Sequence, residues 1–246
     1  MADSSHPLNR VIVSGGGTGG HIHPALAIAD EIKRRHPQCD ILFVGAKGRM
    51  EMEKVPAAGY AIKGLWITGV DRNWRSVRNW LFPFKLISSL WNARRILRRF
   101  RPELVVGVGG FASGPVLHQA AQMGIPTAIQ EQNSFPGITN RLLAKRVGLI
   151  CAGFPGLERW FPADRIVETG NPLRMQVLDA VSDHGQSTEA AWKHFEFDGS
   201  RPVVFVMGGS LGAASMNAAV CCMVEGSTEA LPFDLIWQTG ARYHDS

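Results

Sequence analysis

The N-terminal part of the chain reads VIVSGGGTGGHIHPALAIADEI over residues 11–32. The first four residues form a short apolar run, and the next six are rich in glycine. The remainder places Ala25, Ile28, Ala29 and Ile32 at the spacing of one helix face. A strand, a glycine turn and a helix in this order are typical of a parallel βαβ unit. The stretch therefore predicts a fold of alternating strands and helices.

The same order of features recurs twice along the chain. An apolar run at 104–108 leads into Gly109-Gly110 and a helical pattern, and the run at 203–207 leads into 208–212 and another helical pattern. Further apolar runs that predict buried strands lie at 41–44, 127–129, 149–151, 165–167 and 235–237. The sequence thus predicts an α/β fold, with a Rossmann-like, doubly wound parallel sheet in residues 1–170. Residues 171–246 hold only two strand candidates and are expected to form the beginning of a second such domain.

Positive charge is concentrated in one segment of the chain. The formal net charge of the 246 residues is +5, yet Arg72 to Arg101 contains nine of the 26 Lys and Arg residues and no acidic residue. A local patch argues against a general nucleic-acid binder and favours contact with an anionic surface such as a membrane. Because aromatic side chains beside basic ones suit the membrane interface, the expected contact residues are Trp74, Arg75, Arg78, Trp80 and Phe82.

Cysteine spacing and hydropathy limit the class of protein further. The four cysteines show neither CxxC spacing nor a neighbouring histidine cluster, so we expect no metal site and a reducing compartment. The N-terminus lacks the apolar core of a signal peptide. The longest uncharged run, Leu104 to Gln130, holds five glycines and two prolines, which argues against a membrane-spanning helix.

The first glycine loop allows two interpretations. Gly15, Gly17 and Gly20 satisfy the GxGxxG pattern of dinucleotide sites. The acid expected at the end of the second strand is missing, because that strand ends at Val44-Gly45-Ala46 and Asp40 precedes it. His21 at the mouth of the loop suits a sugar hydroxyl near a phosphate. Alternatively, it only begins the helix and bonds to its own turn.

Three other sites are candidates for ligand contacts. The turn at 208–212 offers backbone N–H groups to a diphosphate, although Ser210 could serve only as a helix cap. Arg174 is either a second contact to those phosphates or an ordinary surface arginine. The polar loop at 130–137 follows a strand, at the end where parallel sheets bind ligands.

Five motifs together resemble those of the MurG family of peripheral membrane N-acetylglucosaminyltransferases. They lie, in the family's order and spacing, at 16–21, 109–115, 131–133, 170–174 and 208–213. The resemblance implies a GT-B fold of two Rossmann-like domains and no cofactor. It also implies inverting transfer of GlcNAc from UDP-GlcNAc to undecaprenyl-diphosphate-linked MurNAc-pentapeptide, in peptidoglycan synthesis at the cytoplasmic face of the bacterial membrane.

The resemblance also implies roles for individual residues. Those expected to contact UDP-GlcNAc are Thr18, Gly19, Gly20, Asn133, Arg174 and Ser210. On the acceptor side it implies Gly110, Phe111, His21 and Glu131, with His21 as the general base and Glu131 the next candidate. Gln130 stands where the family often has histidine, and family members continue past residue 246 through a region that grips the nucleotide.

Two alternatives remain open from the sequence. One is another enzyme of the same architecture, a sugar-nucleotide epimerase or a diacylglycerol glycosyltransferase. The other is a non-catalytic, membrane-bound module that binds a sugar lipid.

Overall fold

The chain divides into two compact units, residues 1–175 and 176–246. The computed structural model describes residues 7–69, 80–182, 186–209 and 212–244. The division lies slightly beyond Gly170, where the sequence places it, because the segment after the last strand of the first sheet still belongs to the first unit.

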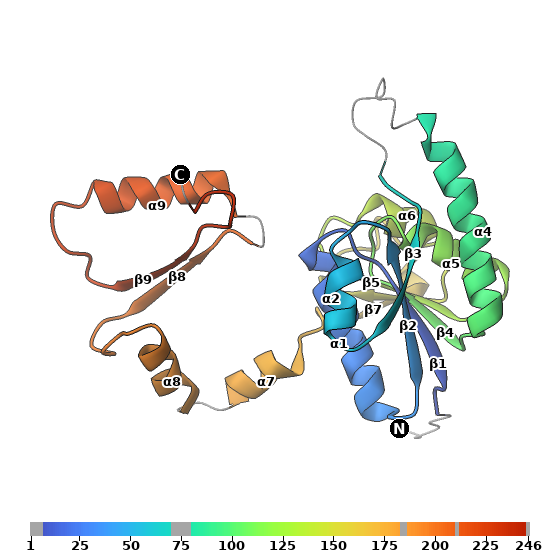
Figure 1. Ribbon diagram of the computed structural model, residues 1–246, viewed down its shortest axis with the longest axis horizontal. Coiled ribbons are helices and arrows are strands. Elements are labelled where there is room, and N and C mark those ends of the chain that lie inside the picture. Colours follow the sequence, from blue (N-terminus) through green and yellow to red (C-terminus); the bar gives the residue numbers. More distant parts are fainter. Residues whose placement is uncertain (1–6, 70–79, 183–185, 210–211, 245–246) are drawn as a thin grey trace. The chain divides into compact units, whose positions relative to one another are not determined.

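A seven-stranded parallel sheet forms the centre of the first unit (Figure 1). Its elements are β1 Arg10–Ser14, α1 Gly19–Arg35, β2 Asp40–Ala46, α2 Glu51–Ala57, β3 Ala61–Leu65, α4 Phe82–Phe100, β4 Leu104–Gly107, α5 Ser113–Gln122, β5 Thr127–Glu131, α6 Ile138–Leu143, β6 Leu149–Ala152, a 3₁₀ turn Ala163–Arg165 and β7 Ile166–Glu168. The strand order is β3-β2-β1-β4-β5-β6-β7. The predicted doubly wound sheet is therefore confirmed.

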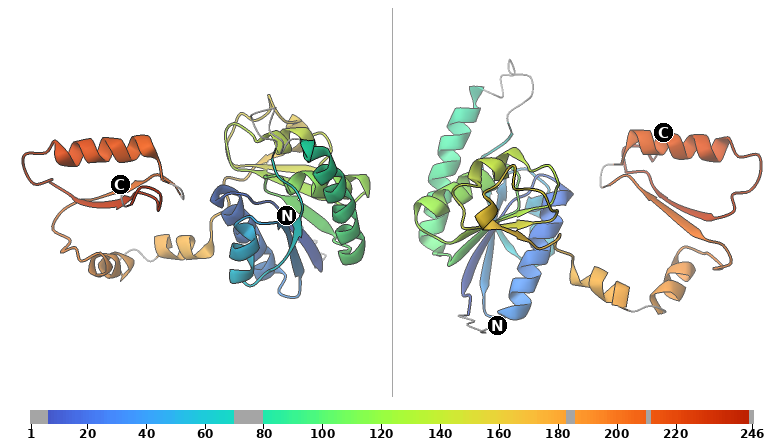
Figure 2. Two further views of the ribbon diagram at one scale, coloured as in Figure 1. Left: turned by 45° about the horizontal axis from the view of Figure 1, so that its top comes forward. Right: turned by 180° about the vertical axis from the view of Figure 1, so that it is seen from behind.

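Helices lie on both faces of this sheet (Figure 2), and alternate residues of the strands pack against opposite helix layers. Val11 and Val13 of β1 belong to the core under α1 and α2, whereas Ile12 faces α4, α5 and α6. All three side chains are fully buried. Because both faces are covered, the strands read as continuous apolar runs rather than alternating ones.

The strand order reverses direction between β1 and β4. The chain moves from β1 outward to β2 and β3, then returns to β4 on the other side of β1. In doubly wound sheets, ligands bind outside the carboxyl ends of the strands at such a point. The loops after β1 and β4 are the two glycine loops identified in the sequence, so the topology places both at this position.

Several details differ from the sequence expectations. Strand β3 and helix α2 are not predicted by the apolar pattern, and neither is the helix α8, Gln186–His194. Helix α1 begins at Gly19, which places Pro24 beyond its first turn and leaves one intrahelical hydrogen bond unmade.

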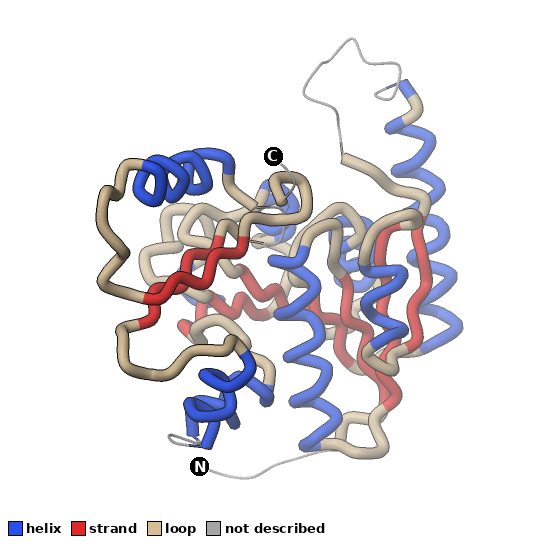
Figure 3. The backbone as a smooth tube through the Cα atoms, turned by 60° about the vertical axis from the view of Figure 1, so that its left-hand side comes forward, coloured by secondary structure: helices blue, strands red, loops and turns tan. Residues whose placement is uncertain are grey.

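The second unit contains one βαβ arrangement. Helices α7 Met175–Ser182 and α8 Gln186–His194 precede β8 Val203–Met207, α9 Ala214–Glu225 and β9 Asp234–Gln238. The two strands pair in parallel with α9 beside them (Figure 3). Asn217 joins the helix to β9, since its side chain accepts from Trp237 Nε1 at 3.1 Å and donates to the Thr239 carbonyl at 3.0 Å.

Candidate functional site

The glycine loops after β1 and β4 pack directly against each other. The backbone of Gly110 lies so close to Gly16 that a Cβ on Gly110 would overlap the Gly16 carbonyl oxygen. Gly110 also has a φ of +82°, which disfavours any side chain there. Ser113 fixes the junction, because its hydroxyl donates to the Ser14 carbonyl at 2.6 Å and lies 2.8 Å from the Gly109 carbonyl.

Glu51, at the start of α2, fixes the first glycine loop by hydrogen bonds. Its side chain is only 1% exposed. One carboxylate oxygen accepts from the Gly17 N–H at 2.8 Å and the other from the Ala46 N–H at 2.9 Å. A Cβ on Gly16 or Gly45 would collide with this side chain. The carboxylate therefore needs glycine at both neighbouring positions.

This arrangement decides between the two interpretations of the first loop. In a dinucleotide site the loop N–H groups face a pyrophosphate, and an acid after the second strand binds the ribose. Here the acid after β2 is Glu51, which is buried and already bonded to the loop itself. The geometry argues against a dinucleotide site. Sequence reasoning missed Glu51 because it looked for the acid at the end of the strand.

His21 lies in the first turn of α1, between the two loops. Its Nδ1 is 3.1 Å from the Thr18 hydroxyl, and a Cβ on Gly109 would lie 2.8 Å from its Nε2. Burial lowers the pKa of His21 below its ordinary value of 6.5, although the charges of Glu131 and Glu51 and a hydrogen bond to the Gly16 backbone act in the opposite direction. The ring is therefore neutral at pH 7 and able to accept a proton.

Glu131 ends β5 and organises the loop that follows it. The side chain is 1% exposed and accepts four hydrogen bonds. They come from the Asn133 backbone at 3.0 Å, the Asn133 side chain at 3.1 Å, the Gly137 backbone at 3.2 Å and the Asn140 side chain at 2.8 Å. Since both oxygens are occupied, this carboxylate is placed to hold the loop and to act on His21 through its charge.

Asn140, on α6, is a further polar residue of this cluster that the sequence did not suggest. It is 2% exposed, and its side chain faces Gly109, whose Cβ would lie 3.6 Å from Nδ2. While Nδ2 donates to Glu131, Oδ1 has no hydrogen-bond partner among the described residues. A buried acceptor without a donor carries a desolvation cost, which Oδ1 of Asn140 bears in this cluster.

A second hydrogen-bond network joins three strand ends beside this cluster. Gln132 donates to the Val108 carbonyl after β4 at 3.0 Å and also to the side chain of Gln130. Asn171, which follows β7, accepts from Gln130 Nε2 at 3.2 Å and donates to the Gln132 carbonyl at 3.2 Å. Gln130 therefore has a structural role here, as part of a network that fixes the loop carrying Asn133.

The structure places the remaining predicted residues in different surroundings. Thr18, Gly19, Gly20, Gly110 and Asn133 lie in or beside the cluster of His21 and Glu131. Phe111 points away, because its ring packs on Gly69. Arg174 is exposed. The pKa of His23 is lowered mainly by partial burial of its ring and, to a smaller extent, by the charge of Arg174. Ser210 lies outside the described residues.

Beside α4 lies an apolar cavity of about 610 Å³. It is lined by Phe82, Leu86, Leu90, Phe111, Leu142 and other side chains. Trp80, just before the helix, is 77% exposed, and Phe84, Ile87 and Trp91 are exposed along it. Trp74, Arg75 and Arg78 lie outside the described residues. The expectation that these aromatic and basic residues contact a membrane stays a prediction.

Two features are absent from the part of the chain that the structure describes. No group of three His, Cys, Asp or Glu side chains there is arranged to hold a metal ion. No described helix combines the length and the apolar character needed to cross a bilayer.

Comparison with known proteins gives one family match. The model of the glycosyltransferase family 28 N-terminal domain matches residues 11–150. This range contains the first two glycine loops, Glu51, Glu131 and Asn140.

Curated relatives match nearly the whole chain. A protein of Christiangramia forsetii named "UDP-N-acetylglucosamine--N-acetylmuramyl-(pentapeptide) pyrophosphoryl-undecaprenol N-acetylglucosamine transferase" is 52% identical over 239 residues, which are 96% of this chain and 63% of the relative. A protein of the same name from Phocaeicola vulgatus is 50% identical, over 95% of this chain and 61% of its own length. The chain thus spans about three fifths of the length of these relatives.

Solved structures agree with this match. The crystal structure of Acinetobacter baumannii MurG is similar with a TM-score of 0.69 and 26% identity, covering 96% of this chain and 62% of that one. A UDP-GlcNAc 2-epimerase from Neisseria meningitidis has a TM-score of 0.61 but only 14% identity, over 94% of this chain and 66% of the epimerase. The second likeness shows the fold alone.

Proposed function

Because the chain belongs to glycosyltransferase family 28, we propose that it acts as part of an inverting N-acetylglucosaminyltransferase of peptidoglycan synthesis. The donor is UDP-GlcNAc, and the acceptor is the MurNAc hydroxyl of an undecaprenyl-diphosphate-linked MurNAc-pentapeptide. The names of the curated relatives support both substrates.

One observation carries the proposal. His21 is a neutral histidine held by Thr18 between two interlocked glycine loops, at the carboxyl ends of β1 and β4. When Nδ1–H donates to the Thr18 hydroxyl, Nε2 keeps its lone pair. This nitrogen can then accept the proton of a sugar hydroxyl as that oxygen attacks.

In the proposed transfer step, one bond forms as another breaks, and His21 takes up the released proton. The acceptor oxygen forms a bond to the anomeric carbon of GlcNAc while the bond from that carbon to the UDP oxygen breaks. His21 receives the hydroxyl proton and becomes an imidazolium, which Glu131 and Glu51 stabilise by their charge. Within the same proposal, Arg174 offsets the charge of the departing diphosphate.

The names of the curated relatives favour a transferase with a muramyl acceptor over the alternatives drawn from the sequence. The epimerase likeness rests on 14% identity and concerns the fold. A transferase also needs a base for an incoming hydroxyl, and the neutral ring of His21 supports that role.

The proposal places the protein as a peripheral protein on the cytoplasmic face of the bacterial membrane, where a lipid-linked acceptor is reached. Exposed Trp80 and Phe84, with the basic residues of α4, support this location. Aromatic side chains beside Lys and Arg suit the interface between lipid and water.

A chimera tests the proposed reaction. The matching segment of the Christiangramia forsetii relative is replaced by this chain, and transfer of labelled GlcNAc to the lipid-linked acceptor is measured. We expect transfer in the chimera and at least a hundredfold loss when it carries His21→Ala. A folded chimera that hydrolyses or epimerises UDP-GlcNAc without using the acceptor would contradict the proposal.

A further inference from the structure

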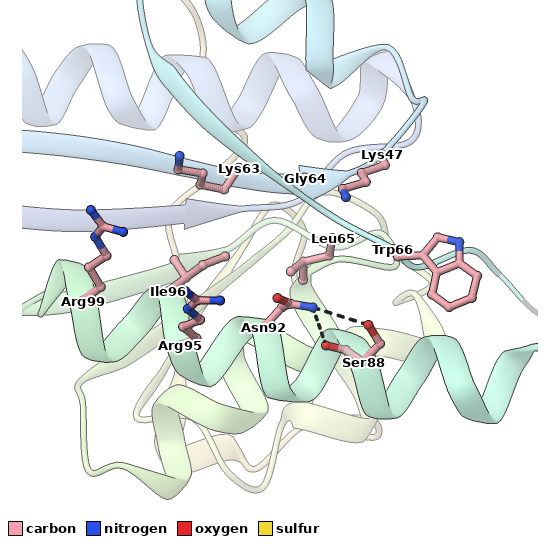
Figure 4. A pocket seen from close by; sticks show the side chains of 10 residues that line it. All are labelled: Lys47, Lys63, Gly64, Leu65, Trp66, Ser88, Asn92, Arg95, Ile96 and Arg99. Carbon is pink, nitrogen blue, oxygen red and sulfur yellow. Dashed lines mark hydrogen bonds between the residues drawn. The ribbon is translucent and has the colours of Figure 1, made fainter.

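A basic pocket lies between strand β3 and the C-terminal half of α4, separate from the cluster around His21. Its volume is about 540 Å³. Figure 4 shows Lys63 and Lys47 on one side, with Arg95 and Arg99 along the helix on the other. None of the residues that line this pocket belongs to the His21 cluster.

The four cations of this basic pocket have no acidic partner among the described residues. No Asp or Glu lines the pocket within that part of the chain. The ion pairs among the described residues involve Arg34, Arg35 and Arg201, none of which lines this pocket. Arg95 contacts the ring of Trp91 at 5.7 Å, which leaves its guanidinium donors free for an oxygen ligand. Four uncompensated positive charges around one cavity favour an anion.

Helix electrostatics alone do not explain this arrangement. Basic residues in the last turn, such as Arg99, complement the dipole of α4. Lys47 and Lys63 come from the end of β2 and from β3, where no such dipole acts. Their place opposite Arg95 and Arg99 therefore needs another reason.

The backbone keeps the basic pocket open. Gly64 forms part of its wall, and a Cβ there would lie 2.7 Å from Cγ of Lys47. Asn92 donates to the Ser88 carbonyl at 2.9 Å, so its amide hydrogens are held on its own helix. Recognition of a ligand is thereby left to the lysine and arginine donors.

We propose that this basic pocket binds a ligand that carries phosphate. Arginine suits phosphate because its planar donors pair with two oxygens at once, and lysine adds a compact charge. Arg95 and Arg99 are four residues apart on one helix, about 6 Å along its axis. Both arginines line the same pocket. This binding site is separate from the proposed transfer reaction, and ligand binding here does not depend on that reaction.

Two sources supply such chemistry, a phospholipid headgroup or a soluble diphosphate. Both present phosphate oxygens to the same donors. Exposed Phe84, Ile87 and Trp91 on α4 would adjoin a bilayer if lipid is the source.

The test uses the full 246-residue chain and two probes. One probe is inorganic pyrophosphate, titrated by calorimetry at low salt. The other is phosphatidylcholine vesicles with and without phosphatidylglycerol, in a flotation assay. The test variant is Lys63→Gln with Arg99→Gln, and Lys47→Gln with Arg95→Gln serves as a second variant in case the first is unstable. The matched control is Lys33→Gln with Lys145→Gln, which removes the same charge from exposed positions outside the pocket.

We expect the pocket variants to weaken binding of at least one probe by about tenfold or more, and the control variant by less than about twofold. A loss confined to the phosphatidylglycerol vesicles identifies a lipid phosphate, and a loss confined to pyrophosphate identifies a soluble ligand. Equal losses in the pocket and control variants would reduce the effect to net charge and overturn the proposal. Failure of the unaltered chain to bind either probe would overturn it as well. Neither result depends on transfer of GlcNAc.

Discussion

The Glu51 carboxylate accepts a hydrogen bond of 2.8 Å from the backbone N–H of Gly17, across 34 positions of sequence. Its other oxygen accepts from Ala46. One buried acid thus joins the first glycine loop to the end of β2. Because the Gly17 N–H donates to Glu51, this loop donor is not available to a ligand anion.

Replacing Glu51 by glutamine should destabilise the first unit. A glutamine amide has one oxygen, so one of the two backbone N–H groups must face an NH₂ group instead of an acceptor. We expect a loss of about 2 kcal/mol in the free energy of unfolding, measured with urea. The matched control is Glu53→Gln, two positions along α2 at an exposed site, which should change stability by less than about 0.5 kcal/mol. Equal effects of both variants would show that Glu51 holds nothing specific.

The junction of the two glycine loops predicts a difference between two glycine substitutions. Gly110 and Gly124 both have positive φ, +82° and +70°. A Cβ on Gly110 would strike the backbone of Gly16, whereas one on Gly124 meets nothing within 4 Å. Gly124→Ala should cost about 1 kcal/mol in unfolding free energy from backbone strain alone. Gly110→Ala should cost at least about 2 kcal/mol more, because the loops must separate. Similar losses would mean that the loops tolerate separation.

Much of the fold could be predicted from local patterns, and the failures have physical causes. β1 and its glycine loop are readable because a strand buried on both faces must be apolar throughout. Strand β3 is missed because it lies at the sheet edge and carries Lys63 and Gly64 within five residues. An edge strand needs less apolar surface, so its pattern is weak.

The candidate site was predicted only in part. His21 and Glu131 stand out because each adjoins a strand end with a distinctive motif. Glu51 and Asn140 contribute through hydrogen bonds to residues that are distant in sequence or on another element, at Gly17 and Glu131. A local pattern carries no information about such pairing. The resemblance makes Glu131 the next candidate for the general base after His21. Its four hydrogen bonds instead favour a role in positioning the loop that follows β5.

Exposed aromatic residues beside α4 predict binding to anionic vesicles. Trp80 and Phe84 are 77% and 65% exposed; Trp80 lies just before the basic helix α4, and Phe84 lies in its first turn. Trp80→Ala with Phe84→Ala should reduce the bound fraction in a phosphatidylglycerol vesicle flotation assay several-fold, because aromatic insertion is lost. Phe154→Ala with Leu173→Ala, also exposed apolar residues, is the control and should bind normally. Binding that is indifferent to the first pair would remove these residues from the membrane contact.

The lowered pKa of His21 predicts how its protonation affects both rate and stability. Burial favours the neutral ring, so the folded state binds a proton less readily than the unfolded chain, in which the pKa is near 6.5. The resulting stabilisation is fully present above pH 6.5 and is lost as the pH falls from there through the folded-state pKa. Transfer should follow the same direction, since only the neutral ring accepts a proton.

In the chimera with the Christiangramia forsetii relative, His21→Ala should lower kcat by about 10² to 10⁴ with little change in donor KM. The same substitution should remove the acid limb of the pH–rate profile, which is the fall in rate at acid pH that protonation of His21 causes. The control is His23→Ala, two positions along α1 and exposed, which should retain both the rate and that limb. Thr18→Val tests the orientation of the His21 ring separately from its ability to accept a proton, because it removes the partner of Nδ1 while keeping the ring. We expect a smaller loss of kcat, with the acid limb retained at a shifted pH. If His21→Ala kept the full rate, or the acid limb survived in it unchanged, another group would have to accept the proton, and the assignment of His21 as base would be wrong.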